Sequence, residues 1–207
     1  MAVDSVGDTS LLLGSQDVPP VLEENAAGRS PFLVTCDHYG RLIPEALGDL
    51  GLPESELSRH IAWDIGIAGV AERLSKQLDA HLIAQRYSRL VIDCNRPPGA
   101  ASSIPVISEA TAVPGNEGLS NESKEIRRRE IFDPYHRRID EVIGQPLGNA
   151  GNADVPGDVA FELARGHTEI AERVRNDPAV VITGEKKGRI AVRIIFMHRR
   201  NIRRRQK

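Results

Sequence analysis

Side chains that could take part in catalysis or metal binding follow an apolar segment that ends at Cys36. The apolar run Phe32–Cys36 continues into Asp37 and His38, which places a carboxylate beside an imidazole. Imidazole is the commonest side-chain ligand for metals in proteins and is also a general base near neutral pH. The pair alone leaves three roles open for His38: metal ligand, base, or structural histidine.

A second pair is formed by His60 and Asp64, which are four residues apart with Trp63 between them. On a helix this spacing puts both side chains on one face, where they can offer ligands to a metal or bond to each other. An ordinary surface pair is the alternative. Trp63, the only tryptophan, suits a core or the wall of a pocket.

A third group surrounds the apolar run 90–92. Arg89 precedes this run, and Asp93, Asn95 and Arg96 follow it. A guanidinium group can bind a carboxylate in bidentate fashion, as a substrate-binding residue would. An aspartate beside two arginines can equally form a structural ion pair, so both interpretations stay open.

Predicted strands would bring the first and third groups together. The runs Phe32–Cys36 and Arg89–Cys94 have the composition of buried strands, and His81–Gln85 predicts a shorter one. Ligands of open α/β sheets bind beyond the carboxyl ends of the strands. His38 and Asn95 would lie at such an edge.

Apolar residues at helical spacing predict a long helix over about residues 54–79. Ser120 predicts the start of a second helix, which runs to about Ile143. Residues 96–119 are rich in proline and glycine and predict a loop long enough to form a wall or lid of a site. A solvated basic face is expected on the second helix, at Lys124, Arg127, Arg128 and Arg138.

Charge and composition divide the chain into four parts. Ten of the 27 Lys and Arg residues lie in 186–207, which has no Asp or Glu, so this part carries +10 and the rest of the chain −12. We expect a flexible leader over 1–30, an α/β body over 31–143, a linker with short elements over 144–185, and a basic tail over 186–207. The tail is either solvated or a binding element for nucleic acid or another polyanion.

Segments after the predicted body include a possible helix over 159–175 and possible strands over 180–183 and 190–196. No run of about 18 apolar residues exists, so no membrane span is predicted. The first residues lack the pattern of a secretory signal. We therefore expect Cys36 and Cys94 to be reduced thiols in a cytoplasmic protein.

Four segments, in this order, resemble the N-formylglutamate amidohydrolase family. They are LVTCDHYGRLIPEALGDLGL, HIAWDIGIAGVAERL, LIAQRYSRLVIDCNRP and IPVISEATAVPGNEGLS, followed by FDPYHRRIDEVI. The resemblance covers about residues 31–143, and YSRLVIDCNRP is its most specific part. It implies an α/β fold, a three-layer sandwich with a mixed sheet, similar to zinc-dependent carboxypeptidases and phosphorylase/hydrolase folds.

The resemblance also implies an activity: hydrolysis of N-formyl-L-glutamate, or a similar acyl-amino acid, to formate and the amino acid during histidine degradation. His38 and Asp64 would then hold a divalent metal, Zn²⁺, which lowers the pKa of a bound water toward ~7. Arg89, Asn95 and Arg96 would hold the carboxylates of the substrate or polarise its carbonyl.

After residue 143 the sequence departs from the family pattern, which continues with a strand ending in His-Ser and later a strand bearing a glutamate. His167 and His198 lack that context, so the third metal ligand and the catalytic base are not identified. Residues 144–207 are either foreign to the family, as after a frame shift, or a divergent C-terminus. The first case predicts an inactive hydrolase, and a non-enzymatic protein with a polyanion-binding tail is the alternative function.

Overall fold

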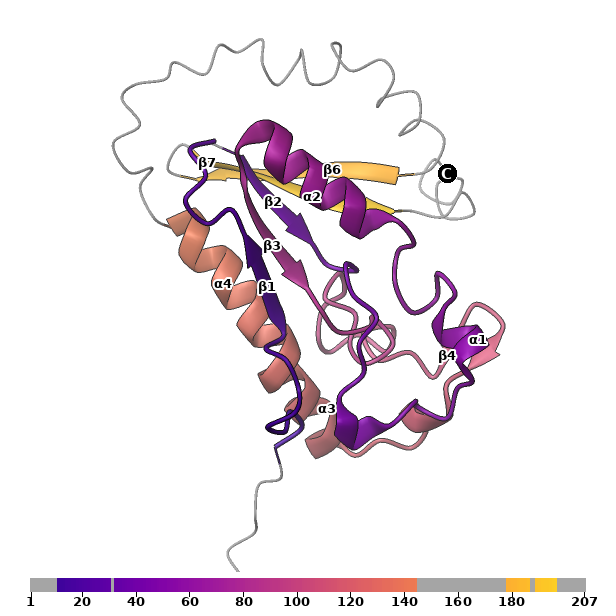
Figure 1. The fold of residues 1–207 in the computed structure, drawn as a ribbon. Helices are drawn as coiled ribbons and strands as arrows, with labels where there is room; N and C mark the ends of the chain where they lie inside the picture. The colour runs from indigo at the N-terminus through magenta and orange to yellow at the C-terminus, as the bar shows by residue number, and fades with distance from the viewer. Residues whose placement is uncertain (1–10, 31, 145–177, 187–188, 197–207) are drawn as a thin grey trace, which may run out of the picture.

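A mixed five-stranded sheet forms the centre of the molecule (Figure 1). The computed structural model describes residues 11–30, 32–144, 178–186 and 189–196. The strands are β1 (Val21–Glu24), β2 (Phe32–Cys36), β3 (His81–Gln85), β6 (Pro178–Lys186) and β7 (Arg189–Phe196), in the order β1-β3-β2-β7-β6. Strand β2 runs parallel to β3 and β7, and the edge strands β1 and β6 are antiparallel to their neighbours. The predicted α/β class with a mixed sheet is confirmed.

Strands β2 and β3 are buried along their whole length. Val34 and Leu82 pack on one side of the sheet, whereas Leu33 and Ile83 pack on the other. A strand covered on both faces needs apolar residues at every position, which is why both runs are continuous rather than alternating. Both strands lie where the sequence predicts them.

Two helices cover opposite faces of the sheet (Figure 1). Helix α2 (Ile67–Leu78) packs Ile67 and Ala71 against the face that carries Val34. Helix α4 (Asp133–Gly144) packs Tyr135 and Val142 against the face that carries Leu33. Among the described residues, no helix combines the length and the apolar character needed to cross a membrane.

The prediction of a single helix over 54–79 is wrong. The segment forms the short helix α1 (Glu54–Leu57), then turns, and then α2. Gly66, immediately before α2, has a left-handed backbone with φ of 84°, a conformation that glycine adopts without strain. The Asp64 amide donates to the His38 carbonyl (3.2 Å), which holds the turn against the end of β2. His60 and Asp64 therefore do not share a helical face.

The strand predicted over Arg89–Cys94 is also absent, since these residues form turns. Their amides bond to loop partners: Arg89 donates to Ala62 (3.1 Å) and Asp93 donates to Ser103 (2.7 Å). The apolar residues of the run are nevertheless buried in a core cluster beneath the loops. A short apolar run indicates burial, but it does not by itself distinguish a strand from other buried backbone.

The sheet extends beyond the predicted body at both ends. Strand β1, in the segment expected to be a flexible leader, pairs with β3, and the amides of Leu12 and Leu13 both donate to Glu130 Oε2 (2.9 Å each). Strand β7, within the predicted basic tail, pairs with β2. Strands β6 and β7 confirm the two late strand predictions. Residues 145–177 of the predicted linker region over 144–185, which include the predicted helix over 159–175, lie outside the described residues.

The second predicted helix is present in three parts. Helix α3 (Asn121–Arg127) begins after Ser120, whose Oγ accepts the Ser123 amide (3.1 Å). A π-helical turn (Arg128–Phe132) joins α3 to α4. Arg127 does not lie on a solvated face as predicted, because it is buried. The preceding loop holds a small hairpin of β4 (Ile107–Ser108) and β5 (Thr111–Ala112), and one-turn 3-10 helices occupy Glu45–Leu47 and Pro114–Asn116.

Candidate functional site

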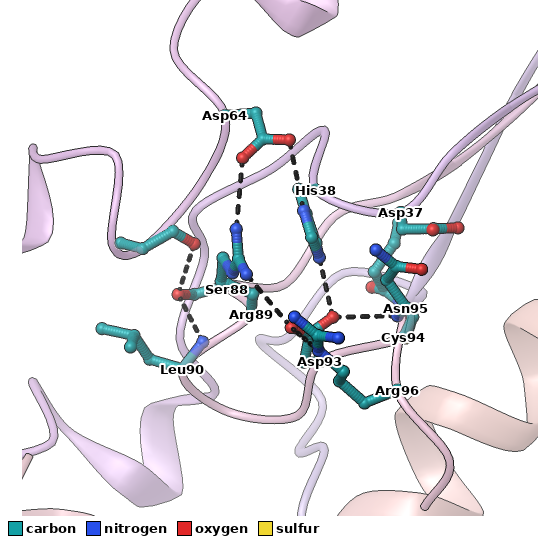
Figure 2. A network of polar contacts seen from close by, with 12 residues as sticks. Asp37, His38, Asp64, Ser88, Arg89, Leu90, Asp93, Cys94, Asn95 and Arg96 are labelled. Carbon is teal, nitrogen blue, oxygen red and sulfur yellow. Dashed lines mark hydrogen bonds and ion pairs between the residues drawn. The ribbon is translucent and has the colours of Figure 1, made fainter. Parts of the chain in front are cut away.

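Three loops meet beyond the carboxyl end of β2 (Figure 2). They carry His38, Asp64, and the turn from Ser88 to Arg96. The Ala62 carbonyl accepts both the Arg89 amide (3.1 Å) and the Ser88 hydroxyl (2.8 Å), which ties the second loop to the third. Backbone hydrogen bonds therefore bring together side chains that are far apart in the sequence.

His38 lies between two carboxylates. Its Nδ1 is 3.2 Å from Asp64 Oδ2, and its Nε2 is 2.7 Å from Asp93 Oδ1. His38 is only 2% exposed and Asp64 only 5% exposed, so the contacts are screened from water. Burial lowers the pKa of the imidazole, but the hydrogen bonds to Asp64 and Asp93 outweigh burial and raise this pKa above 6.5. Without a metal, the two carboxylates thus favour the charged form of the His38 imidazole.

Arg89 completes a closed arrangement with the same two carboxylates. Its Nη1 donates to Asp64 Oδ1 (3.3 Å) and its Nη2 donates to Asp93 Oδ2 (3.2 Å). Each carboxylate therefore gives one oxygen to His38 and the other to Arg89, as Figure 2 shows. We call these four residues, His38, Asp64, Arg89 and Asp93, the ionic ring.

The pKa of Asp93 is strongly lowered within the ionic ring. Burial raises the pKa of its carboxyl group, but the hydrogen bond and charge of His38, together with the charge of Arg89, lower this pKa to about 2. The Asn95 amide also donates to Asp93 Oδ1 (2.9 Å). Asp93 is therefore ionised at any pH near neutrality and supplies a fixed negative charge behind His38.

Asn95 and Arg96 lie at the outer side of the ionic ring. The Arg96 side chain is 40% exposed, and its Nε is 3.8 Å from Asp93 Oδ2. The side chain is therefore partly accessible from solvent. Asn95 is half-buried beside it. The loops thus place all five predicted site residues, His38, Asp64, Arg89, Asn95 and Arg96, in one region.

The donor pair His38 and Asp64 fits a zinc ion. Zn–N and Zn–O bond lengths near 2.0–2.2 Å put two donors on a tetrahedral ion about 3.3 Å apart, close to the 3.2 Å between His38 Nδ1 and Asp64 Oδ2. The short contact from Nε2 to Asp93 matches the outer carboxylate that usually orients a metal-bound histidine. Within the described ranges, no cluster of three or more His, Cys, Asp or Glu side chains could hold a metal.

Helix α4 supports the site from behind with two residues that sequence reasoning did not assign. The Tyr135 hydroxyl donates to Asp37 Oδ1 (2.8 Å), and both side chains are buried. His136 Nε2 is 3.0 Å from the carbonyl of Cys94, in the turn that carries Asn95. The available signal was the spacing of Tyr135 on the apolar face of a helix, which predicts burial for a residue whose hydroxyl then needs a partner.

Comparisons with known proteins point to one family. The family model of N-formylglutamate amidohydrolase matches residues 30–153, more than half of the chain. An N-formylglutamate deformylase of Pseudomonas putida is 31% identical over 119 residues, 53% of this chain and 43% of that protein. Another, of Pseudomonas aeruginosa, is 31% identical over 143 residues, 61% of this chain and 50% of that protein.

A solved structure is also similar. The crystal structure of a gene product of Agrobacterium tumefaciens has a TM-score of 0.63 and 37% sequence identity, and the match covers 75% of this chain and 55% of that chain. This chain spans about half the length of the curated relatives that it matches. The family match, the sheet and the arrangement of the motif residues lead to one conclusion: the chain belongs to the N-formylglutamate amidohydrolase family.

Proposed function

We propose that this protein is a metal-dependent amidohydrolase that cleaves N-formyl-L-glutamate or a similar small acyl-amino acid. The observation that carries the proposal is the ionic ring, in which a buried His38 is held by Asp64 and Asp93 beyond a central strand. The names of the relatives support the reaction class and the substrate class. We extend the proposal to the three-layer sandwich of zinc carboxypeptidases, to histidine degradation and to a cytoplasmic location, on the family resemblance.

His38 and Asp64 would hold the divalent cation, which we propose to be Zn²⁺. When bound, such an ion polarises a carbonyl oxygen and lowers the pKa of a bound water to about 7. Asp93 accepts the hydrogen bond from His38 Nε2–H and so fixes the tautomer in which Nδ1 has a free lone pair. Since Asp64 and Asp93 raise the pKa of the metal-free imidazole, protonation of His38 would compete with binding of the metal.

Arg96 and Asn95, at the outer side of the site, would recognise the substrate. A guanidinium group forms two parallel hydrogen bonds with a carboxylate, and Arg96 is exposed enough to do so. Asn95, beside it, offers an amide that can donate to a second oxygen. The family resemblance assigns Arg89 to the same task, although its Nη1 and Nη2 already donate to Asp64 and Asp93.

The test is release of formate from N-formyl-L-glutamate by the purified chain, with added Zn²⁺ and after chelation. We expect Zn²⁺-dependent release, and a fall in kcat/KM of about a hundredfold or more in His38→Ala, because loss of the metal removes several kcal/mol of transition-state stabilisation. His60→Ala is the matched control, since His60 is half-exposed, is not one of the four residues of the ionic ring, and contacts Glu109 Oε1 (2.9 Å). Equal activity in His38→Ala, or no formate from the Zn²⁺-loaded chain, would overturn the proposal.

A further inference from the structure

We propose that Arg89 is a positioning residue, which holds Asp64 and Asp93 in the orientations that grip His38, and that it does not bind the substrate. The inference rests on the proposed function of the same site. It reverses the role that the family resemblance suggests for Arg89. Three features of the structure support it: the closed geometry of the ionic ring, the anchoring of Arg89, and the contrast with Arg96.

The geometry of the ionic ring makes Arg89 a bridge between two loops. Asp93 is four residues from Arg89 in the same turn, whereas Asp64 belongs to the turn before α2. A carboxylate that accepts a hydrogen bond from His38 through one oxygen can still rotate about its terminal torsion, because that torsion has a broad energy minimum. The second contact, from Arg89 to the other oxygen, fixes the plane of each carboxylate.

The backbone of Arg89 is itself held in place by hydrogen bonds. Its amide donates to the Ala62 carbonyl, which also accepts the Ser88 hydroxyl, and this hydroxyl accepts the Leu90 amide (3.1 Å). The side chain is 25% exposed, so most of it is enclosed by the loops. A guanidinium group fixed at its backbone and at both terminal nitrogens suits orientation of neighbours better than capture of an incoming ligand.

Binding a substrate carboxylate would instead require Arg89 to leave its partners. Two carboxylates that are almost fully buried would then lose a cation, and an unpaired buried charge is strongly unfavourable. Arg96 faces a smaller cost, because its side chain is 40% exposed and its ion pair with Asp93 spans 3.8 Å, longer than a hydrogen bond. The two arginines thus have different roles: Arg89 orients Asp64 and Asp93, and Arg96 binds the substrate.

The experiment compares Arg89→Met with Arg96→Met in the full chain. The readouts are Zn²⁺ affinity by competition with a chromogenic chelator, the absorption bands of the Co²⁺-loaded protein, and kcat and KM for formate release. We expect Arg89→Met to weaken Zn²⁺ binding by about 10–100-fold, the usual effect of removing an outer partner of a metal ligand, to shift the Co²⁺ bands and to lower kcat. Arg96→Met should raise KM with Zn²⁺ affinity and Co²⁺ bands unchanged.

Arg89→Lys tests the same point with a milder change. An ammonium group keeps the charge but cannot reach both carboxylates in the planar fork of a guanidinium, so we expect an intermediate loss of Zn²⁺ affinity. This variant also serves if Arg89→Met does not fold, as judged by circular dichroism. Wild-type Zn²⁺ affinity and Co²⁺ bands in both Arg89 variants, with a raised KM, would overturn the proposal and make Arg89 a substrate ligand.

A metal-free measurement separates this inference from the proposed function. The ring ¹⁵N resonances of His38, assigned by their loss in His38→Ala, report its hydrogen bonds without metal or substrate. We expect Arg89→Met or Arg89→Lys to broaden or shift them and Arg96→Met to leave them unchanged. If the wild-type chain bound no Zn²⁺, the proposed function would fail, but these resonances would still decide the role of Arg89. Unchanged His38 resonances in the Arg89 variants would refute the positioning role of Arg89.

Discussion

Two arginines near the same turn have opposite surroundings. Arg89 is partly exposed, and both of its terminal nitrogens donate to carboxylates. Arg127 is 1% exposed, and every hydrogen bond that it makes within the described residues ends on a neutral oxygen: Val91 O (3.1 Å), Asn116 Oδ1 (2.6 Å) and Gly115 O (3.3 Å). Burial lowers the pKa of Arg127 to about 10, so it is still charged at neutral pH.

The difference shows how one loop is held from two sides. Val91, whose carbonyl accepts from Arg127, lies between Arg89 and Asp93 in the chain. Asn116, the second partner of Arg127, donates to Leu90 O and Pro105 O (2.8 Å each). Hydrogen bonds from Arg127 to neutral oxygens thus hold the backbone of the turn, whereas Arg89 binds the two carboxylates of the ionic ring. We expect Arg127 to determine stability and Arg89 to determine metal binding.

The largest expected effect is on stability, in Arg127→Ala. The change removes a large buried side chain and leaves Val91 O, Gly115 O and Asn116 Oδ1 without their donor, which costs about 3–5 kcal/mol of unfolding free energy. Urea denaturation measures it. Arg129→Ala, an exposed arginine two residues further along, is the matched control and should change stability by less than about 0.5 kcal/mol. An Arg127→Ala protein as stable as the wild type would contradict the structural role.

Asp93→Asn tests whether the ionic ring determines metal binding. An amide is a weaker acceptor for His38 Nε2 than a carboxylate and adds no charge, so we expect Zn²⁺ affinity to fall by about 10–100-fold. The loss of unfolding free energy in the metal-free protein should be smaller than in Arg127→Ala. Competition with a chelator gives the affinity, and Asp140→Asn, on the exposed side of α4, should leave it unchanged. Unaltered Zn²⁺ binding in Asp93→Asn would separate Asp93 from the metal.

The sequence predicts which residues come together better than it predicts the elements that carry them. Asp64 lies beside His38 and Asn95 beside Asp93, yet the helix expected to carry Asp64 and the strand expected to precede Asn95 are turns. Hydrogen bonds between distant segments, from Asp64 to His38 and from Asp93 to Ser103, override the local apolar pattern there. Local pattern also fails for Arg127, because its acceptors come from segments 11 to 36 residues away. Such partners are visible only once the chain is folded.

Tyr135→Phe tests support of the site by a neutral donor. It removes only the hydroxyl that donates to Asp37 Oδ1, next to His38, and we expect a loss of about 1 kcal/mol of unfolding free energy with little cavity formation. Zn²⁺ affinity should change less than in Asp93→Asn, because Tyr135 does not touch the ionic ring. Tyr39→Phe is the control, since Tyr39 donates to Glu72 Oε1 (2.8 Å) at a half-buried position and should cost less. Equal losses in the two variants would show that burial of the hydroxyl does not matter.

The smallest effect is expected at a third arginine, Arg138 on α4. It binds Glu23 of β1 through Nε (2.8 Å) and Nη2 (2.9 Å), and His81 Nε2 is 2.8 Å from Glu23 Oε2. The hydrogen bond from Arg138 is the main reason that the pKa of Glu23 lies below 4.5, its ordinary value.

Because the folded-state pKa of Glu23 is lowered, the pair stabilises the fold above pH 4.5 and loses this contribution as the pH falls through the folded value. Glu23→Gln should therefore cost at most about 1 kcal/mol at pH 7, as for other pairs near the surface, and should flatten the decline of unfolding free energy below pH 4.5. Urea midpoints from pH 7 to pH 3 measure both effects. Glu125→Gln, which removes the exposed pair with Arg128, is the control and should change the urea midpoint at pH 7 by less than Glu23→Gln does. A slope in Glu23→Gln as steep as in the wild type would mean that a well-formed arginine pair at this depth adds nothing to stability, which would sharpen the contrast with the buried Arg127.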